Sequence, residues 1–174
     1  MRIGLGLLAI PATLALLANA EVGPFERTVA ALTSGTATGG HPGNRLRTAG
    51  TTLLLLGARP IEGEDLGLRW SKGAKLPPPY RRRALGPGYR SVSLARGDAA
   101  HFEQVFLAGQ RAQVALVPFN QSEFRLEVSD DQGSKQCAVP AAMRCSWIPL
   151  WTTRYRIDVV NTGKKPGSSY LVMQ

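Results

Sequence analysis

The side chains most often used for catalysis and metal binding are scarce in this sequence. Its 174 residues include two histidines, His41 and His101, and two cysteines, Cys137 and Cys145. A catalytic nucleophile needs a general base within reach and a third group that orients this base. Neither a GxSxG nor an HExxH motif occurs in the chain. We therefore expect no catalytic residues, no metal site and no cofactor.

The first twenty residues are typical of an export signal. Met1 and Arg2 give a positive start, residues 3–17 form an apolar run, and Ala18-Asn19-Ala20 offers the small residues that a signal peptidase recognises. The run is short for the roughly 20 residues that span a bilayer, and no later stretch is long and apolar enough. We therefore predict cleavage after Ala20, a periplasmic or secreted protein, and no integral membrane segment.

Export changes the interpretation of the two cysteines. An oxidising compartment favours a disulfide between Cys137 and Cys145, which lie eight residues apart on either side of the turn-like Pro140-Ala141-Ala142. A cross-strand link within one hairpin suits this spacing. The alternative is a metal or redox pair, but the chain has no CxxC motif and no nearby histidine.

The charge of the chain suggests a class of partner. After residue 20 there are 20 Lys and Arg against 12 Asp and Glu, a formal net charge of +8. A basic exported protein can associate with anionic envelope surfaces or acidic polysaccharides, whereas export removes it from cytoplasmic nucleic acid. The densest basic cluster is Arg81-Arg82-Arg83, which is either an anion contact or a solvated linker.

Two further motifs have both a binding and a structural interpretation. Trp147 and Trp151 flank Pro149; exposed rings can stack on sugars, but a tryptophan near a disulfide more often packs in a core. Asp130 and Asp131 precede Gln132-Gly133 and can supply calcium ligands. We favour an ordinary turn there, because Asp and Gly suit turn backbones.

The elements that position these residues fall into two regions after residue 20. Residues 21–83 predict a helix at 21–32, where Phe25, Val29 and Leu32 repeat with helical spacing. A loop follows at 34–44, then a second helix at 45–56, a helical turn at 66–70 and an extended polyproline stretch at 75–80. We expect this region to pack on the rest of the chain or to present a partner site.

Residues 84–174 form the predicted second domain. Short runs of alternating apolar and polar residues recur about every ten residues, which is typical of an antiparallel sandwich or barrel. We predict eight strands, at residues 89–94, 101–107, 110–117, 123–129, 135–139, 143–147, 154–160 and 169–173. The predicted fold is mainly β, a jelly-roll-like antiparallel β-sandwich with a short N-terminal helical and irregular region.

The order of motifs in this domain resembles a known family. The motifs are Leu94-Ala95-Arg96-Gly97, Phe106-Leu107-Ala108-Gly109-Gln110, Asp131-Gln132-Gly133, Tyr155-Arg156-Ile157-Asp158-Val159-Val160-Asn161 and a final Tyr170. Over residues 88–174 the chain resembles the bacterial pre-peptidase C-terminal domain, a β-sandwich found on secreted proteases and other exported proteins. The resemblance implies an accessory or binding role without catalysis. Residues 122–128 lack the paired aspartates common in that family, so a calcium or saccharide role does not carry over.

The sequence thus favours an exported, non-enzymatic β-sandwich protein of binding or accessory type. Its expected partner is an anionic envelope component, a polysaccharide or another exported protein, with Arg81, Arg82, Arg83, Trp147 and Trp151 as candidate contacts. A carbohydrate-binding module is the alternative. A small hydrolase is less favoured, because His101, beside Glu103 on a predicted strand, is more typical of a half-exposed strand residue.

Overall fold

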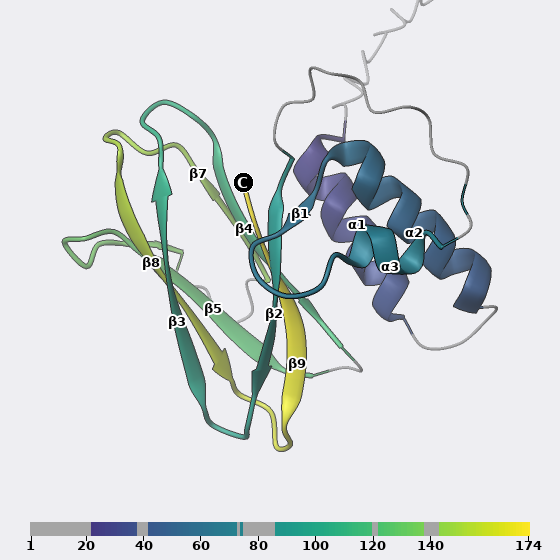
Figure 1. The fold of residues 1–174 in the computed structure, drawn as a ribbon. Helices are drawn as coiled ribbons and strands as arrows, with labels where there is room; N and C mark the ends of the chain where they lie inside the picture. The colour runs from purple at the N-terminus through teal and green to yellow at the C-terminus, as the bar shows by residue number, and fades with distance from the viewer. Residues whose placement is uncertain (1–21, 38–41, 73, 75–85, 120–121, 138–142) are drawn as a thin grey trace, which may run out of the picture.

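The computed structural model describes residues 22–37, 42–72, 74, 86–119, 122–137 and 143–174. These residues form three layers: a group of helices, a five-stranded sheet and a four-stranded sheet (Figure 1). Several sequence predictions lie outside the described residues. They are the export signal, His41, the polyproline stretch, Arg81-Arg82-Arg83 and the turn between the cysteines.

The helical layer contains α1 (Pro24–Thr36), α2 (Pro42–Leu56) and the short α3 (Leu66–Trp70). Both longer helices were predicted, but with different ends. Each begins at a proline, whose fixed φ suits the first turn of a helix. At the other end of α1, Thr33 and Thr36 donate side-chain hydrogen bonds to the carbonyls of Val29 and Leu32, and the helix continues four residues beyond the predicted end.

The two sheets contain nine strands among the described residues. The first has the order β1 (Arg59–Pro60), β2 (Gly88–Leu94), β9 (Gly167–Met173), β4 (Ala112–Pro118) and β7 (Arg144–Trp147). The second has the order β3 (Ala99–Phe106), β8 (Thr153–Asn161), β5 (Phe124–Ser129) and β6 (Lys135–Cys137). Neighbours are antiparallel except β1 and β2. The β-sandwich and all eight strands predicted after residue 88 are confirmed.

The five-stranded sheet is buried on both faces at its centre. In β4, Val114 and Leu116 pack against the four-stranded sheet, whereas Ala115 and Val117 pack against the helices. Strand β9 behaves in the same way, so that its residues 169–173 are all buried. The alternation that predicted a strand at 110–117 therefore accounts only for the face toward the other sheet, because a helical layer covers a second apolar face.

Close contacts attach the helices to one another and to this sheet. A Cβ at Gly50 would lie 2.6 Å from the backbone nitrogen of Ser71, so α2 and α3 approach closely only because residue 50 is glycine. The hydroxyl of Tyr89 on β2 accepts a 2.9 Å hydrogen bond from the backbone N–H of Leu66. Burial is the main reason that the pKa of Tyr89 rises to about 12. The N-terminal region thus packs on the sandwich and shares its core.

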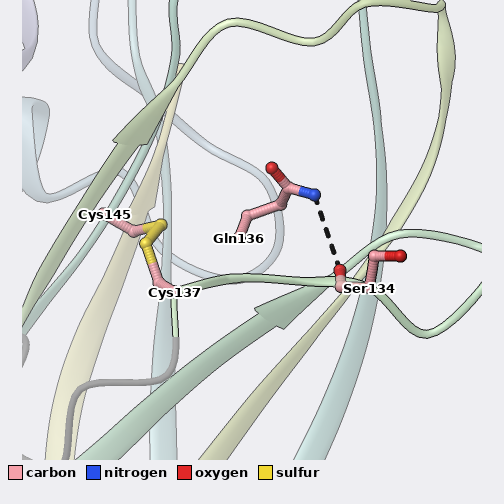
Figure 2. The surroundings of a disulfide bond; sticks show 4 residues. All are labelled: Ser134, Gln136, Cys137 and Cys145. Carbon is pink, nitrogen blue, oxygen red and sulfur yellow. Dashed lines mark hydrogen bonds between the residues drawn. A yellow bond between two sulfur atoms is a disulfide. The ribbon is translucent and has the colours of Figure 1, made fainter.

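The disulfide joins the two sheets rather than the strands of one hairpin. Cys137 and Cys145 are bonded, with their Cα atoms 6.0 Å apart. Figure 2 shows the bond between the two side chains. Cys137 ends β6, which pairs with β5, whereas Cys145 lies on β7, which pairs with β4. The predicted hairpin was therefore wrong, because the short connection between the cysteines carries the chain from one sheet to the other. The disulfide closes the sandwich along this side.

Replacing both cysteines by serine (Cys137→Ser with Cys145→Ser) is expected to lower the free energy of unfolding by about 2–3 kcal/mol. The disulfide joins residues that are eight positions apart, and it thereby reduces the conformational freedom of the unfolded chain. Urea denaturation of the oxidised protein and of this variant measures the difference. The wild type unfolded in reductant serves as the control and is expected to match the variant. Equal unfolding free energies for the oxidised protein and the variant would show that the link contributes no stability.

Candidate binding loop

Four large apolar side chains are exposed at one end of the sandwich. Leu107 is 50 % exposed, Ile148 59 %, Leu150 80 % and Trp151 75 %. Three of them belong to the segment between β7 and β8, and Leu107 follows β3. In Figure 1 the connections from β3 to β4 and from β7 to β8 lie together at the upper left. We call these four side chains the apolar loop cluster.

Two hydrogen bonds hold the two parts of the cluster together. The N–H of Gly109 donates to the carbonyl of Pro149 at 2.9 Å, and the N–H of Ala108 donates to the hydroxyl of Thr152 at 3.0 Å. Leu107 is therefore fixed next to the segment that carries Leu150 and Trp151. The exposed side chains thus belong to a loop that is held through the carbonyl of Pro149 and the hydroxyl of Thr152.

An aromatic group supports the loop from below. The ring of Trp147 lies 5.0 Å from that of Phe106 and 5.2 Å from that of Tyr155, measured between centroids. Phe106 and Tyr155 are buried on the paired strands β3 and β8 of the opposite sheet. Trp147 is thus partly buried and packs against the core, whereas Trp151 is largely exposed. The structure separates the two tryptophans that the sequence offered as one candidate platform.

A cavity of about 260 Å³ opens beside the cluster, between the ends of the two sheets. Its lining includes Val105 and Leu107 from the β3 side, Arg111 before β4, and Met173 at the end of β9. The apolar loop cluster therefore borders a hollow with both apolar and basic walls.

The outer face of the four-stranded sheet carries a network of charges. Arg156 on β8 donates from Nε to Asp158 at 2.8 Å, and Arg154 pairs with Glu103 on β3 at 3.0 Å. His101 also contacts Asp158. Partial burial would raise the pKa of Asp158, but the hydrogen bonds from Arg156 and His101 outweigh burial and lower it below the ordinary value. Opposite charges on neighbouring strands account for this face without a bound ligand.

His101 has no nucleophile beside it in the described structure. Its Nδ1 atom contacts Asp158 and lies 3.0 Å from Nη2 of Arg156, and among the described residues it has no hydrogen bond to a serine, threonine or cysteine. His101 therefore contacts the carboxylate of Asp158 on the neighbouring strand. The arrangement does not form the linked nucleophile, base and orienting group that hydrolysis requires.

The aspartates that could have bound calcium form a turn. Oδ1 of Asp130 accepts the N–H groups of Gln132 at 3.0 Å and Ser134 at 2.7 Å, and Asp131 accepts from the hydroxyl of Thr153. This is the backbone-capping role for which Asp is favoured in turns. Within the described ranges, no group of three or more His, Cys, Asp or Glu side chains could hold a metal ion. In the same ranges, no helix is long and apolar enough to cross a membrane.

Of the predicted candidates, the structure places Trp151 in the apolar loop cluster and Trp147 beneath it. The sequence analysis missed Leu107, Ile148 and Leu150 as possible contact residues. For Ile148 and Leu150 a signal was available: they continue the period-two positions of the polar residues Arg144 and Ser146, which point outward on β7. The sequence offered no such signal for Leu107.

Comparisons with known proteins give distant likenesses. No family model and no curated protein matches the sequence. A solved structure of PliG from Aeromonas hydrophila, a periplasmic lysozyme inhibitor of g-type lysozyme, is 15 % identical, with 67 % of this chain and 96 % of that chain covered and a TM-score of 0.37. A de novo designed double-stranded β-helix is 15 % identical, with 49 % and 97 % covered and a TM-score of 0.31. We draw no functional conclusion from either likeness.

The Asp158→Asn substitution is expected to destabilise the protein at neutral pH and to have little effect in strong acid. Because the pKa of Asp158 is lowered in the folded state, its ionised form stabilises the fold above the ordinary Asp value of 3.8, and this contribution is lost as the pH falls through the lowered pKa. Urea denaturation over a pH series measures the difference. The control is Glu123→Gln, at an exposed carboxylate without an ion pair to the described residues. A difference between Asp158→Asn and the wild type that does not change with pH would contradict the role of this carboxylate.

Proposed function

We propose that this protein is an exported, non-enzymatic binding protein that docks its apolar loop cluster onto a partner protein of the cell envelope. The observation that carries the proposal is the exposure of Leu150 and Trp151, 80 % and 75 %, on a loop fixed at its base. Clustered exposed apolar side chains usually mark interaction sites on soluble proteins. Tryptophan is among the residues that dominate binding energy when buried in an interface.

The rigidity of the loop supports the proposal. Ordering a flexible segment on binding costs free energy. Here the bonds from Ala108 and Gly109 and the packing of Trp147 already fix the loop in the free protein. Trp151 and Leu150 can therefore be buried against a partner with little further loss of conformational freedom.

Export is supported by two independent features. The first is the signal-like pattern of residues 1–20, and the second is the disulfide between the sheets, which suits an oxidising compartment. The resemblance of residues 88–174 to the pre-peptidase C-terminal domain stays a prediction, and an accessory role of that kind agrees with the proposal. The net positive charge of the chain after residue 20 favours a location near anionic envelope surfaces.

Carbohydrate binding is the second candidate, and one observation favours it. The ring of Trp151 is exposed and can present a flat aromatic face, the surface on which sugar rings stack. The apolar neighbours Ile148 and Leu150 favour the protein partner, because aliphatic side chains add contact area without stacking. The two candidates differ in what they require at position 151.

Binding of the purified, oxidised protein to an envelope extract of the source organism tests the proposal, with immobilised peptidoglycan and polysaccharides as separate arms. Trp151→Ala is expected to weaken binding to a proteinaceous partner by about 30-fold, as removal of an interface tryptophan does. Leu150→Ser is expected to weaken it less. The matched control is Leu68→Ser, which removes a leucine that is 61 % exposed on α3 in the helical layer.

The side chain at position 151 separates the two candidates. Protein docking predicts that Trp151→Leu retains part of the affinity, whereas sugar stacking predicts that only Trp151→Phe or Trp151→Tyr does. Binding lost equally in Leu68→Ser, or fully retained in Trp151→Ala, would refute the proposed site. Binding confined to the polysaccharide arms would favour the carbohydrate-binding module instead.

A further inference from the structure

The edges of the two sheets are protected unequally. Among the described strands, β1 and β7 end the first sheet, and β3 and β6 end the second. Strand β1 has two residues, one of them Pro60, β6 has three residues and β7 has four. The disulfide also ties β6 to β7. Short strands and proline are the usual means by which proteins prevent unwanted pairing at sheet edges.

Strand β3 lacks these protections. It has eight residues, Ala99–Phe106, all paired with β8 on one side and without a strand partner among the described residues on the other. It contains no proline, no glycine and no lysine, and its penultimate residue, Val105, is 48 % exposed. A long, regular edge of this kind is a template for adding another strand.

The register with β8 shows which backbone groups face the open edge. The N–H of Asn161 donates to the carbonyl of Asp98 at 2.9 Å, so residues 98 and 161 form a hydrogen-bonded pair. The backbone N–H and C=O groups of successive residues in an antiparallel strand point to alternate sides. Since Asp98 bonds to Asn161, the even-numbered residues of β3 point these groups toward β8. The odd-numbered residues Ala99, His101, Glu103 and Val105 point theirs outward.

The charges of these outward-facing residues select one self-pairing. When two copies of β3 pair antiparallel through their open edges, each odd-numbered residue lies opposite an odd-numbered residue of the other copy. The possible registers then differ in which odd-numbered residues are opposite each other. A register centred on residue 101 or 103 places His101 opposite His101, or Glu103 opposite Glu103. The register centred on Phe102 places His101 of each copy opposite Glu103 of the other, and Ala99 opposite Val105. A carboxylate directly across from an imidazole can accept a hydrogen bond from the ring, and the two form an ion pair when the ring is protonated. Two carboxylates directly across from each other weaken pairing.

We propose that two copies of this protein associate through β3 in antiparallel register about a two-fold axis at Phe102, which joins the two four-stranded sheets into one continuous sheet. The charge network on the outer faces continues across the junction. Glu103 already pairs with Arg154, and His101 with Asp158, so each new pair of His101 and Glu103 extends a row of alternating charges. The paired segment ends beside Leu107, so the junction adjoins the apolar loop cluster. The association does not depend on the proposed function, because no side chain of that cluster takes part in the strand pairing.

Sedimentation velocity of the full, oxidised protein over a range of concentrations tests the proposal, and a concentration-dependent dimer is expected. Glu103→Pro removes an edge-facing N–H and no internal hydrogen bond of the sheet, so it is expected to give a folded monomer. The matched control is Ser91→Pro on β2. The carbonyl of Tyr89, two residues earlier, accepts from Ile61 on the β1 side, so Ser91 faces the open edge of the other sheet. This control is expected to dimerise like the wild type.

A pair of charge variants keeps the test decisive if the proline variant fails to fold. Glu103→Lys places a lysine opposite His101 in its homodimer and so removes the pair of carboxylate and imidazole, and His101→Glu places two negative side chains opposite each other. Each alone is expected to dimerise about tenfold more weakly than the wild type. Mixed together, they place one carboxylate opposite the introduced lysine and another opposite His101, and they are expected to form a heterodimer.

Three results would overturn the proposal. The first is a wild-type protein that stays monomeric at all concentrations. This also holds if the monomer binds an added extended peptide at β3, because the occupant of the edge would then not be a second copy. The second is a dimer that survives Glu103→Pro or is lost in Ser91→Pro. The third is a mixture of the two charge variants that associates no better than either variant alone.

Discussion

The structure depends on one constraint: the central strands of the five-stranded sheet must be buried on both faces. Alternate residues of β4 and β9 point in opposite directions, and both sets are apolar, as in Val114 and Ala115 or Leu171 and Val172. One layer of strands can cover only one of these faces. The helices α1, α2 and α3 are therefore required to cover the other face, and each of the outer layers depends on the sheet between them.

This arrangement holds the loops at both ends of the sandwich in place and leaves some apolar side chains on them exposed. At one end, the aromatic rings of Phe106, Trp147 and Tyr155 support the loop that exposes Leu150 and Trp151. At the other end, the chain passes from β2 to β3 and from β8 to β9 at the bottom of Figure 1. The buried Asn161 links these two turns, because its Nδ2 donates to the carbonyls of Leu94 and Lys165. The loops are thus positioned by the sheets, and exposed apolar side chains on them cost little in conformational freedom when they bind.

The alternation of apolar and polar residues was sufficient to predict the eight strands of the sandwich, because period two is set by backbone geometry. The sequence could not assign strands to sheets. A separation of eight residues between Cys137 and Cys145 fits a hairpin and a crossing between sheets equally well, and only the partners of β6 and β7 distinguish the two. The exposure of Trp151 was also undecided, since a tryptophan near a disulfide suits either a core or a surface. Long-range packing decides both features.

Native-state hydrogen exchange tests most directly whether the three layers form one cooperative unit. If the sheet and the helices depend on each other, the amides of the buried residues Leu32 on α1 and Leu53 on α2 exchange with the same free energy as those of Leu116 on β4 and Leu171 on β9, through global unfolding. Exchange of the helical amides at a much lower free energy, while β4 and β9 stay protected, would show a sandwich that is stable without its helical layer and would contradict this account.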